Sequence, residues 1–403
     1  MGHKVREVIS HLFLTLAVAV SVIFAHSDIH AQAVADRTVL MRAFERFPVA
    51  EAVPDTVSIV FIGDVMLHQA QIENTRQPDG SHCFEEYFRS LEKDFQQADV
   101  CVANMEFTLG GKPYSGYPAF SAPDSYAEYM AKCGIDIFLT ANNHILDKGE
   151  KGFRRTLEQY RTLGREYGIK FTGSTDSNTF DKDAGPLMIY VKGLRIALIN
   201  FTYGTNTAPG DKKCFGPLRM GSAEIEQTVS IAKKLEADYI IALPHWGNEY
   251  ILKHSVSQRD MAEMLANLGV DAIIGTHPHV VQDFEEIEIS RKGSGDNENV
   301  VKKVPVVYSV GNAVSNMSAP DTQAGLMVTL SICKSPEGTV EFNSIKFTYL
   351  WCSLAGRLRG SHCTVKIADM LDKKDEWIQK YEYDKMVSTY KRVQKATGIK
   401  DSL

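Results

Sequence analysis

The 403-residue chain lacks an apolar run of about 20 residues, the length that a comfortable membrane span requires. Its N-terminal apolar stretch, Leu12 to Ala25, follows Lys4 and Arg6 and precedes the small residues Ala31-Gln32-Ala33. A positive segment, an apolar core and an A-x-A-like site in this order are typical of a secretory signal peptide. We therefore expect residues 1–33 to be a signal peptide removed after Ala33; an uncleaved membrane anchor is the alternative.

The chain also lacks charge blocks, long Pro, Gly or Ser tracts and internal repeats, which argues against disorder. Its 44 Lys and Arg and 50 Asp and Glu give a net charge of −6. A nucleic-acid-binding protein would show a basic patch, so we expect no nucleic-acid partner. The roughly 370 remaining residues suffice for one large domain. We expect a linker at 34–56, a domain at 57–350 and a C-terminal helical appendage at 351–403.

Cysteine usage gives little support for a disulfide framework, because seven cysteines cannot all pair within one exported chain. Cys352 and Cys363 flank a short loop with Gly356 and Gly360, and they are the only pair that we single out as a candidate disulfide. No cysteine lies near the expected cleavage site, so lipidation there is not indicated.

Several short hydrophobic runs end in residues that can bind metal or move protons. Each run has the length and the β-branched content of a strand, and helical patterns at 84–97, 125–133, 150–167, 223–236 and 257–268 alternate with them. This alternation predicts a layered α/β domain. The runs at 187–191 and 194–200 flank Lys192-Gly193 as a hairpin would, so we expect a mixed sheet or two sheets face to face.

The polar residues at these strand ends favour a metal centre, since open α/β folds place ligands at the carboxyl ends of strands. In Gly275-Thr276-His277-Pro278-His279, two imidazoles separated by a stiff proline can each reach a separate ion. Two divalent ions about 3.5–4 Å apart need a shared carboxylate and further O and N ligands. Polar loops whose side chains bond to backbone are the alternative. The residues at strand ends are Asp64, Glu106, Asn143, His144, His245, His277 and His279.

The order of the motifs resembles the CapA family of poly-γ-glutamate capsule biosynthesis proteins, a branch of the calcineurin-like metallophosphoesterases. The resemblance covers roughly Val57 to Asn316. It implies a four-layer α/β/β/α sandwich with two mixed sheets and a two-metal site. It also implies a role in making, exporting or attaching an extracellular anionic polymer. The motifs are Gly-Asp, Asn-x-Glu, Ala-Asn-Asn-His, His-Trp-Gly-x-Glu-Tyr, Gly-Thr-His-Pro-His-Val-Val-Gln and Tyr-Ser-Val-Gly-Asn.

The resemblance also implies roles for single residues. Glu106 would bridge two divalent ions (Mn, Zn, Fe or Mg), with Asp64 and His279 on one ion. Asn143, His245 and His277 would bind the other ion, and His144 would be the catalytic proton donor. The candidate substrate-binding residues are Asn104, Asn142, Trp246, Glu249 and Asn312.

One position departs from the wider phosphoesterase pattern. Those enzymes carry Asp-x-His at the first motif, whereas this chain has Asp64-Val65-Met66. A thioether is a poor ligand for a hard divalent ion, so the first ion would be bound more weakly, differ in identity or be absent. His68 could take over only if its loop folded back.

Two classes of function follow. The first is a metal-dependent hydrolase or transferase of the periplasm or cell envelope, which would cleave phosphoesters or act on γ-glutamyl amides; a general metal-dependent phosphoesterase is a variant of it. The second is a non-catalytic accessory subunit of a capsule export complex. The expected partners are an anionic polymer or phosphoester substrate and membrane-bound capsule synthesis proteins. Cations that could meet a polyanion are Lys148, Arg154, Arg155, Lys253 and His254.

Overall fold

The computed structural model describes residues 56–176, 185–208, 216–292, 299–334 and 340–402. The expected signal peptide and nearly all of the expected linker lie outside the described residues. Within the described part of the chain, no helix is both long and apolar enough to cross a lipid bilayer.

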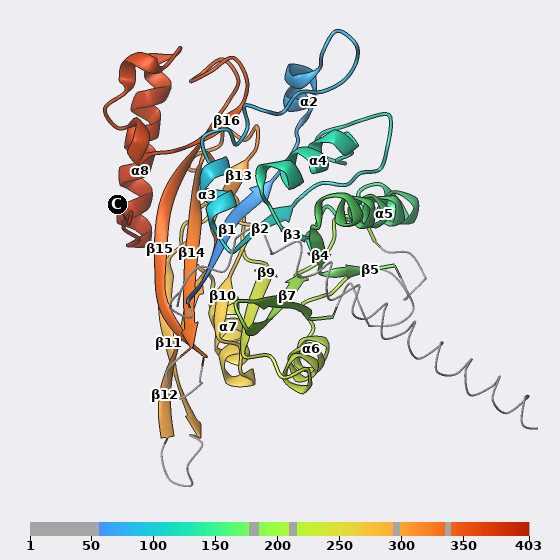
Figure 1. Cartoon of the computed structure of the whole chain (residues 1–403). Coiled ribbons are helices and arrows are strands. Elements are labelled where there is room, and N and C mark those ends of the chain that lie inside the picture. The colour runs from blue at the N-terminus through green and yellow to red at the C-terminus, as the bar shows by residue number, and fades with distance from the viewer. Residues whose placement is uncertain (1–55, 177–184, 209–215, 293–298, 335–339, 403) are drawn as a thin grey trace, which may run out of the picture. The chain divides into compact units, whose positions relative to one another are not determined.

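The first sheet is mixed and has the strand order β16-β15-β14-β1-β2-β3-β4, with β13 beside β1 (Figure 1). β1 to β4 pair in parallel, whereas β14 pairs antiparallel with β1 and continues into the antiparallel β15 and β16. Its strands are β1 Thr56–Val65, β2 Val100–Met105, β3 Ile137–Leu139, β4 Lys170–Thr172, β13 Asn312–Val314, β14 Ala324–Lys334, β15 Val340–Ser353 and β16 Cys363–Lys366.

The second sheet is also mixed and has the order β11-β12-β10-β9-β7-β6. Its central strands are parallel, and the antiparallel pairs β6–β7 and β11–β12 lie at its two edges. The expected hairpin around Lys192-Gly193 is the β6–β7 pair. Its strands are β6 Leu187–Val191, β7 Leu194–Thr202, β9 Tyr239–His245, β10 Ala272–Ile274, β11 Phe284–Lys292 and β12 Asn299–Val307; β5 Ser174–Thr175 and β8 Gly216–Pro217 form a separate ladder.

Helices α4 to α7 cover the outer faces of the two sheets. One helix-side core joins Tyr126 of α4 and Phe153 of α5 to Val60 of β1. The other joins α6 and α7 to alternate residues of β7 and β9, such as Ala242. The helices are α2 Gln69–Thr75, α3 Glu92–Gln97, α4 Asp124–Cys133, α5 Gly149–Tyr167, α6 Ser222–Lys234, α7 Val256–Leu268 and α8 Lys380–Thr397, with short 3₁₀ turns at Ala368–Met370 and Lys374–Glu376.

A third core lies between the two sheets. Successive strand residues point to opposite faces, so Phe61 and Ile241, buried outside the helix-side cores, face the other sheet. Phe284 of β11 and Phe347 of β15 meet across this interface, with ring centroids 5.3 Å apart. The predicted four-layer α/β/β/α sandwich with two mixed sheets is therefore confirmed.

Three details of the sequence-based prediction were wrong. We predicted a helix at 84–97, but only Glu92–Gln97 is helical. The preceding apolar residues are buried without a helix, in a series of turns. The expected domain end at residue 350 falls inside β15, and β16 adds a further strand to the same sheet. Residues Ala52–Leu403 form one compact unit, so the C-terminal segment is more than a helical appendage.

The candidate disulfide is also wrong. On the paired strands β15 and β16, Cys352 lies opposite Thr364, and Cys363 lies opposite Ser353. Adjacent residues of a strand point to opposite faces, so the two thiols lie on different sides of the sheet. Both cysteines are buried and free.

Candidate metal centre

The predicted ligands come together because strands of both sheets end at the same edge. Asp64 lies at the end of β1, Glu106 directly follows β2, and His245 ends β9. The loops after β3 and β10 bring Asn143 and His144, and His277 and His279. All seven of these side chains are buried. The strand-end pattern in the sequence therefore corresponds to one spatial cluster.

Glu106 lies at the centre of this cluster. Its side chain is 0% exposed, and neither carboxylate oxygen has a hydrogen-bond partner among the described residues. Three imidazole Nε2 atoms surround its Oε1, those of His279 at 3.7 Å, His245 at 3.8 Å and His144 at 4.0 Å. Burial, reinforced by the nearby Asp64, raises the pKa of Glu106 well above its usual range. A buried carboxylate without a partner is costly, and a bound cation would compensate for that cost.

Two groups of side chains have their ligand atoms within 4.8 Å of one another, and Glu106 belongs to both. One group adds His277 and His279, and the other adds Asp64 and His245. Carboxylate oxygens combined with imidazole nitrogens suit Zn, Mn and Fe. The donor set fits divalent metal. The carboxylate of Glu106 and Nδ1 of His277, which find no hydrogen-bond partner in the described part of the chain, support this fit.

The grouping differs from the predicted partition of ligands between two ions. We expected Asp64 with His279 and His245 with His277, whereas the close groups join Asp64 to His245 and His277 to His279. Asp64 also contacts His279, with 3.2 Å between Oδ2 and Nδ1. Both arrangements leave Glu106 as the carboxylate common to the two groups.

Two imidazoles of this cluster, those of His245 and His277, favour their neutral form, which is the form that binds metal. Burial lowers the pKa of His245 well below its usual value, and His277 and His279 lower it further. Burial, with a contribution from His279, lowers the pKa of His277 to about 3. For His279, burial is the largest single influence and lowers the pKa, but the hydrogen bond with Asp64, the charges of Asp64 and Glu249 and the hydrogen bond with Asn312 together outweigh it and leave the pKa raised.

The His277-Pro278-His279 turn has a strained backbone. The φ angle is +99° at His277 and +57° at His279, values that residues with a Cβ seldom adopt. Two hydrogen bonds hold the turn: the His277 N–H donates to Asp64 Oδ2 (3.3 Å), and the Tyr250 N–H donates to the Pro278 carbonyl (2.9 Å). Strain of this kind is typical of functional sites.

Two of the three asparagines predicted to bind substrate, Asn104 and Asn312, contact candidate ligands. Asn104, fully buried, donates from Nδ2 to Asp64 Oδ1 at 2.7 Å. Asn312 Oδ1 lies 3.0 Å from His279 Nδ1, and Asn142 donates to the Met105 carbonyl at 2.8 Å. Hydrogen bonds to such partners fix the orientation of metal ligands. These three amides are buried and occupied, so a role in direct substrate contact does not fit.

The other two predicted substrate-binding residues differ from each other. Trp246 is fully buried in the helix-side core of the second sheet, and its indole N–H donates to the Tyr308 carbonyl at 2.9 Å. Its side chain is part of the core, which corrects the prediction. Glu249 is exposed. The pKa values of Tyr203 and Tyr250 are raised mainly by the burial of these tyrosines and next by the charge of Glu249. It therefore lies at the outer side of the centre.

His144 is held by Asp147, a residue that our set of candidate site residues omitted. Their Nδ1 and Oδ2 atoms are 2.7 Å apart, and Asp147 Oδ2 also accepts from the Phe120 N–H at 2.8 Å. This bond orients the ring so that Nε2 is the atom nearer Glu106. The His-x-x-Asp spacing within one turn is the feature of the sequence from which this pair could have been predicted. A histidine fixed by a carboxylate is suited to donate or accept a proton.

Asn143 and two further residues also contact the candidate ligands. Asn143 Oδ1 lies 2.9 Å from His245 Nε2, while Thr276 Oγ1 lies 3.0 Å from His245 Nδ1. Asn206 approaches both Asn143 and His144 at 3.4–3.5 Å. Thr276 and Asn206 were missed because neither residue type signals a metal centre in the sequence.

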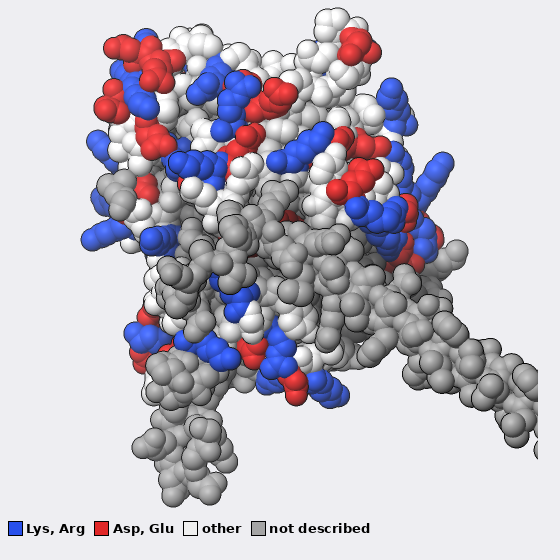
Figure 2. Space-filling view, in the orientation of Figure 1, with Lys and Arg blue, Asp and Glu red and all other residues white. Residues whose placement is uncertain are grey.

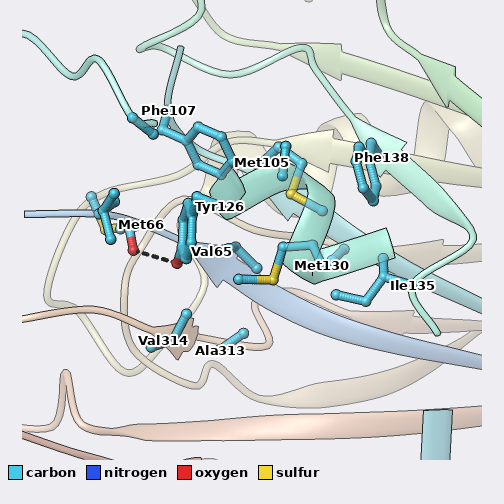
Figure 3. Packing of buried hydrophobic residues seen from close by; sticks show 14 of the residues in the cluster. Val65, Met66, Met105, Phe107, Tyr126, Met130, Ile135, Phe138, Ala313 and Val314 are labelled. Atoms are coloured by element: carbon cyan, nitrogen blue, oxygen red, sulfur yellow. Dashed lines mark hydrogen bonds between the residues drawn. The ribbon is translucent and has the colours of Figure 1, made fainter. Parts of the chain in front are cut away.

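Met66 does not reach the centre. Its side chain is 2% exposed and lies in the helix-side core of the first sheet, and its carbonyl accepts from the Tyr126 hydroxyl at 2.9 Å (Figure 3). His68 lies at the start of α2, where its Nδ1 accepts from the Asn316 N–H at 3.2 Å. Neither residue belongs to the two groups of potential metal ligands found among the described residues.

Most of the cations singled out in the sequence already have acidic partners. Arg155 makes a two-pronged pair with Asp124 at 2.7 and 2.8 Å. Lys253 and His254 both contact Asp283. On the face drawn in Figure 2, basic and acidic side chains are interspersed. These residues do not form a continuous basic surface that could bind a polyanion.

The fold and its strand-end residues define a two-sheet α/β protein with a buried carboxylate and imidazole cluster suited to divalent metal. The chain belongs to the family described as bacterial capsule synthesis protein PGA_cap, which it matches over residues 58–317. The resemblance to CapA proteins that the motifs indicated is thereby confirmed.

Two relatives carry related names. The chain is 26% identical over 294 residues to the capsule biosynthesis protein CapA of Bacillus anthracis, a match that covers 70% of this chain and 65% of that protein. It is 24% identical over 298 residues to the PGA biosynthesis protein CapA of Bacillus subtilis (strain 168), covering 72% of each. The chain thus spans just under two thirds of the Bacillus anthracis protein.

Similar solved structures include nucleotidases. One is the NAD nucleotidase of Haemophilus influenzae, with a TM-score of 0.45 and 14% identity, covering 84% of this chain and 62% of that chain. Another is a 5'-nucleotidase precursor from Thermus thermophilus, with a TM-score of 0.43 and 12% identity, covering 84% of this chain and 59% of that chain.

Proposed function

We propose that this chain is an exported metal-dependent hydrolase or transferase that acts in the synthesis, export or attachment of an extracellular anionic polymer such as poly-γ-glutamate. The observation that carries this proposal is the buried Glu106 carboxylate, which has no hydrogen-bond partner among the residues that the structure describes and faces three imidazole nitrogens. The capsule-related names of the family and of its two relatives support the biological role.

The residues that would hold two divalent ions are Asp64, Glu106, Asn143, His245, His277 and His279, with Glu106 shared. Bound ions would supply Lewis acidity and a water of lowered pKa. Asn104, Thr276 and Asn312 would keep the ligands in place through the hydrogen bonds described above. Glu106 and its neighbours are buried, so bulk water has little access to the centre.

The proton donor in this proposal is His144, acting through Nε2. In phosphoester hydrolysis, the oxygen of water bonds to phosphorus and releases one proton to solvent, while the ester oxygen leaves and takes a proton from His144, which then regains a proton from solvent. For a γ-glutamyl amide, the same proton would go to the leaving nitrogen. Asp147 holds the opposite ring nitrogen at 2.7 Å and stabilises the protonated imidazole.

We expect His144→Ala to keep its bound metal and lose about 10²–10⁴-fold of the activity toward a phosphoester or γ-glutamyl substrate, the usual contribution of a positioned histidine. Asn143→Ala, in contrast, should lose both activity and bound metal, because the Asn143 amide oxygen contacts the candidate ligand His245. Metal analysis and steady-state kinetics of both variants would test this. The control is His82→Ala, because the His82 ring lies outside the centre and stacks on Phe84. Loss of metal from His144→Ala would make His144 a ligand and contradict its assignment.

A non-catalytic accessory subunit of a capsule export complex is the second candidate function. The observation that favours it is the burial of Met66 in the apolar core, which leaves the first motif one ligand short of the phosphoesterase pattern. The two candidates differ in metal content: about two equivalents of divalent ion in the purified protein support the enzyme, and none supports the subunit.

Export is the remaining part of the proposal, and membrane-bound capsule synthesis proteins would then be its partners. We expect the mature chain to begin near Val34 and to lie outside the cytoplasmic membrane, with a membrane-anchored form if the leader stays uncleaved. Mass spectrometry of the native protein would test this prediction. An intact Met1 terminus on protein recovered from the cytosol would contradict it.

A further inference from the structure

Three exposed tyrosines surround the outer side of the candidate metal centre. Tyr117, Tyr203 and Tyr250 are 72%, 45% and 47% exposed, unusually high values for large apolar rings. Their ring centroids lie 6.4 Å from His144, 4.5 Å from His277 and 6.3 Å from His279, respectively. They come from three different loops, which follow β2, β7 and β9. We call these three residues the aromatic collar.

The backbone fixes the collar to the centre. The Tyr203 N–H donates to the His245 carbonyl at 3.0 Å, and the Tyr250 N–H donates to the Pro278 carbonyl at 2.9 Å. Tyr250 has a φ of +65°, which is seldom adopted by a residue with a Cβ and is often found at binding sites. Beside Tyr117, Gly116 packs so closely on the start of α2 that a Cβ would lie 2.2 Å from the Gln69 nitrogen. The rings therefore hold defined positions over the centre.

One exposed carboxylate, that of Glu249, lies near Tyr203 and Tyr250. Arg219 lies on the Tyr203 side and donates to the Thr205 hydroxyl at 3.4 Å. The collar thus offers apolar ring faces and neutral hydroxyl groups beside the exposed carboxylate of Glu249.

We propose that the aromatic collar binds an uncharged sugar ring of the substrate, next to the bond that the metal centre cleaves. The face of an aromatic ring is partly negative and attracts the positively polarised C–H bonds of a sugar. The phenol hydroxyls and Glu249 can bond the hydroxyl groups of that sugar. A carboxylate at the position of this ring would be repelled by the exposed Glu249, whereas the phosphate of a sugar phosphoester would lie at the metal centre. This inference rests on the proposed function, and it makes the favoured substrate a phosphoester of a sugar.

The test compares small substrates on the full mature chain with its bound metal. We expect a hexose 1-phosphate to be hydrolysed with a lower KM than glycerol 3-phosphate, which has no ring. Tyr203→Ala and Tyr250→Ala should each raise the KM for the hexose ester about tenfold, the upper range for a ring contact, and raise the KM for glycerol 3-phosphate by a much smaller factor. Tyr190→Ala is the matched control, because Tyr190 is 57% exposed on β6, away from the collar.

Calorimetric titration with a neutral hexose oligosaccharide gives a readout that does not depend on turnover. Binding that is lost in the collar variants and kept in Tyr190→Ala supports the inference, even if no phosphoester is cleaved and the proposed function fails. Binding of a γ-glutamyl hexamer that is lost in Arg219→Gln but kept in the collar variants overturns it. Absence of oligosaccharide binding to the unmodified protein also overturns it.

Discussion

Replacement of Glu106 by glutamine is expected to remove most of the divalent metal from the purified chain. Glutamine keeps the volume of the side chain but loses the charge that both groups of ligands share. Loss of a residue that only supports a ligand costs about 10–100-fold in metal affinity, so loss of a shared ligand should cost more. Metal analysis after gel filtration would measure the remaining equivalents. Asp64→Asn, which belongs to one group, should lose less metal, and equal losses from the two variants would argue against a shared Glu106.

The same substitution should change how the stability of the metal-free protein depends on pH. The pKa of Glu106 is raised in the folded state, so the folded protein binds more protons than the unfolded chain above pH 4.5. The free energy of unfolding contributed by Glu106 therefore falls as pH rises from 4.5 toward that raised pKa. Glu106→Gln has no such loss. Urea unfolding of chelator-treated protein at about pH 5 and about pH 8 should show a smaller decrease in the variant than in the unmodified protein.

The position of the centre follows from a pattern that a sequence can carry. Hydrophobic strands that end in Asp64, Glu106 or His245 place these side chains at one edge whenever the strands are parallel. The repeat of this pattern along the chain made the α/β assignment and the clustering of the candidate ligands predictable. Each of these features depends on residues that are close in the chain.

The roles of the amides could not be predicted in the same way. Asn104, Asn142 and Asn312 stand at strand ends just as the ligands do, but their partners lie 33 to 40 residues away in the sequence. Whether such a side chain faces a substrate or holds a metal ligand in place depends on which residue lies beside it on the neighbouring strand. Only the register of the sheet, with Asp64 opposite both Asn104 and Asn312, shows that these two asparagines support ligands.

Trp246 and Met66 show a second limit. Both stand within motifs that carry ligands, and alternation along the chain turns their side chains away from the centre. Trp246 follows His245 and packs under α6 and α7, while Met66 packs under α4. A motif marks a segment of backbone, but the direction of each side chain follows from the strand on which it lies.

Gly63→Ala is expected to destabilise the fold by more than about 4 kcal/mol, the range reached when a substitution forces backbone apart. Gly63 precedes Asp64 in β1, and a Cβ at this position would lie 1.7 Å from the Gly311 carbonyl oxygen. That oxygen accepts the Asp64 N–H at 3.0 Å, and the next residue, Asn312, pairs with Asp64. Because the close atom belongs to the backbone, relief would require β13 to move away from β1 and carry Asn312 away from His279.

The control for this substitution is Gly204→Ala, since a Cβ at Gly204 would meet no atom within 4 Å. Urea unfolding should show a large loss for Gly63→Ala and a change of less than about 0.5 kcal/mol for Gly204→Ala, as is usual for open surface positions. Any Gly63→Ala protein that folds should also bind less metal, because Asp64 and Asn312 would no longer be in register. Near-equal stability and metal content of the two variants would show that β1 and β13 can separate freely, and the close approach at Gly311 would then not position Asp64.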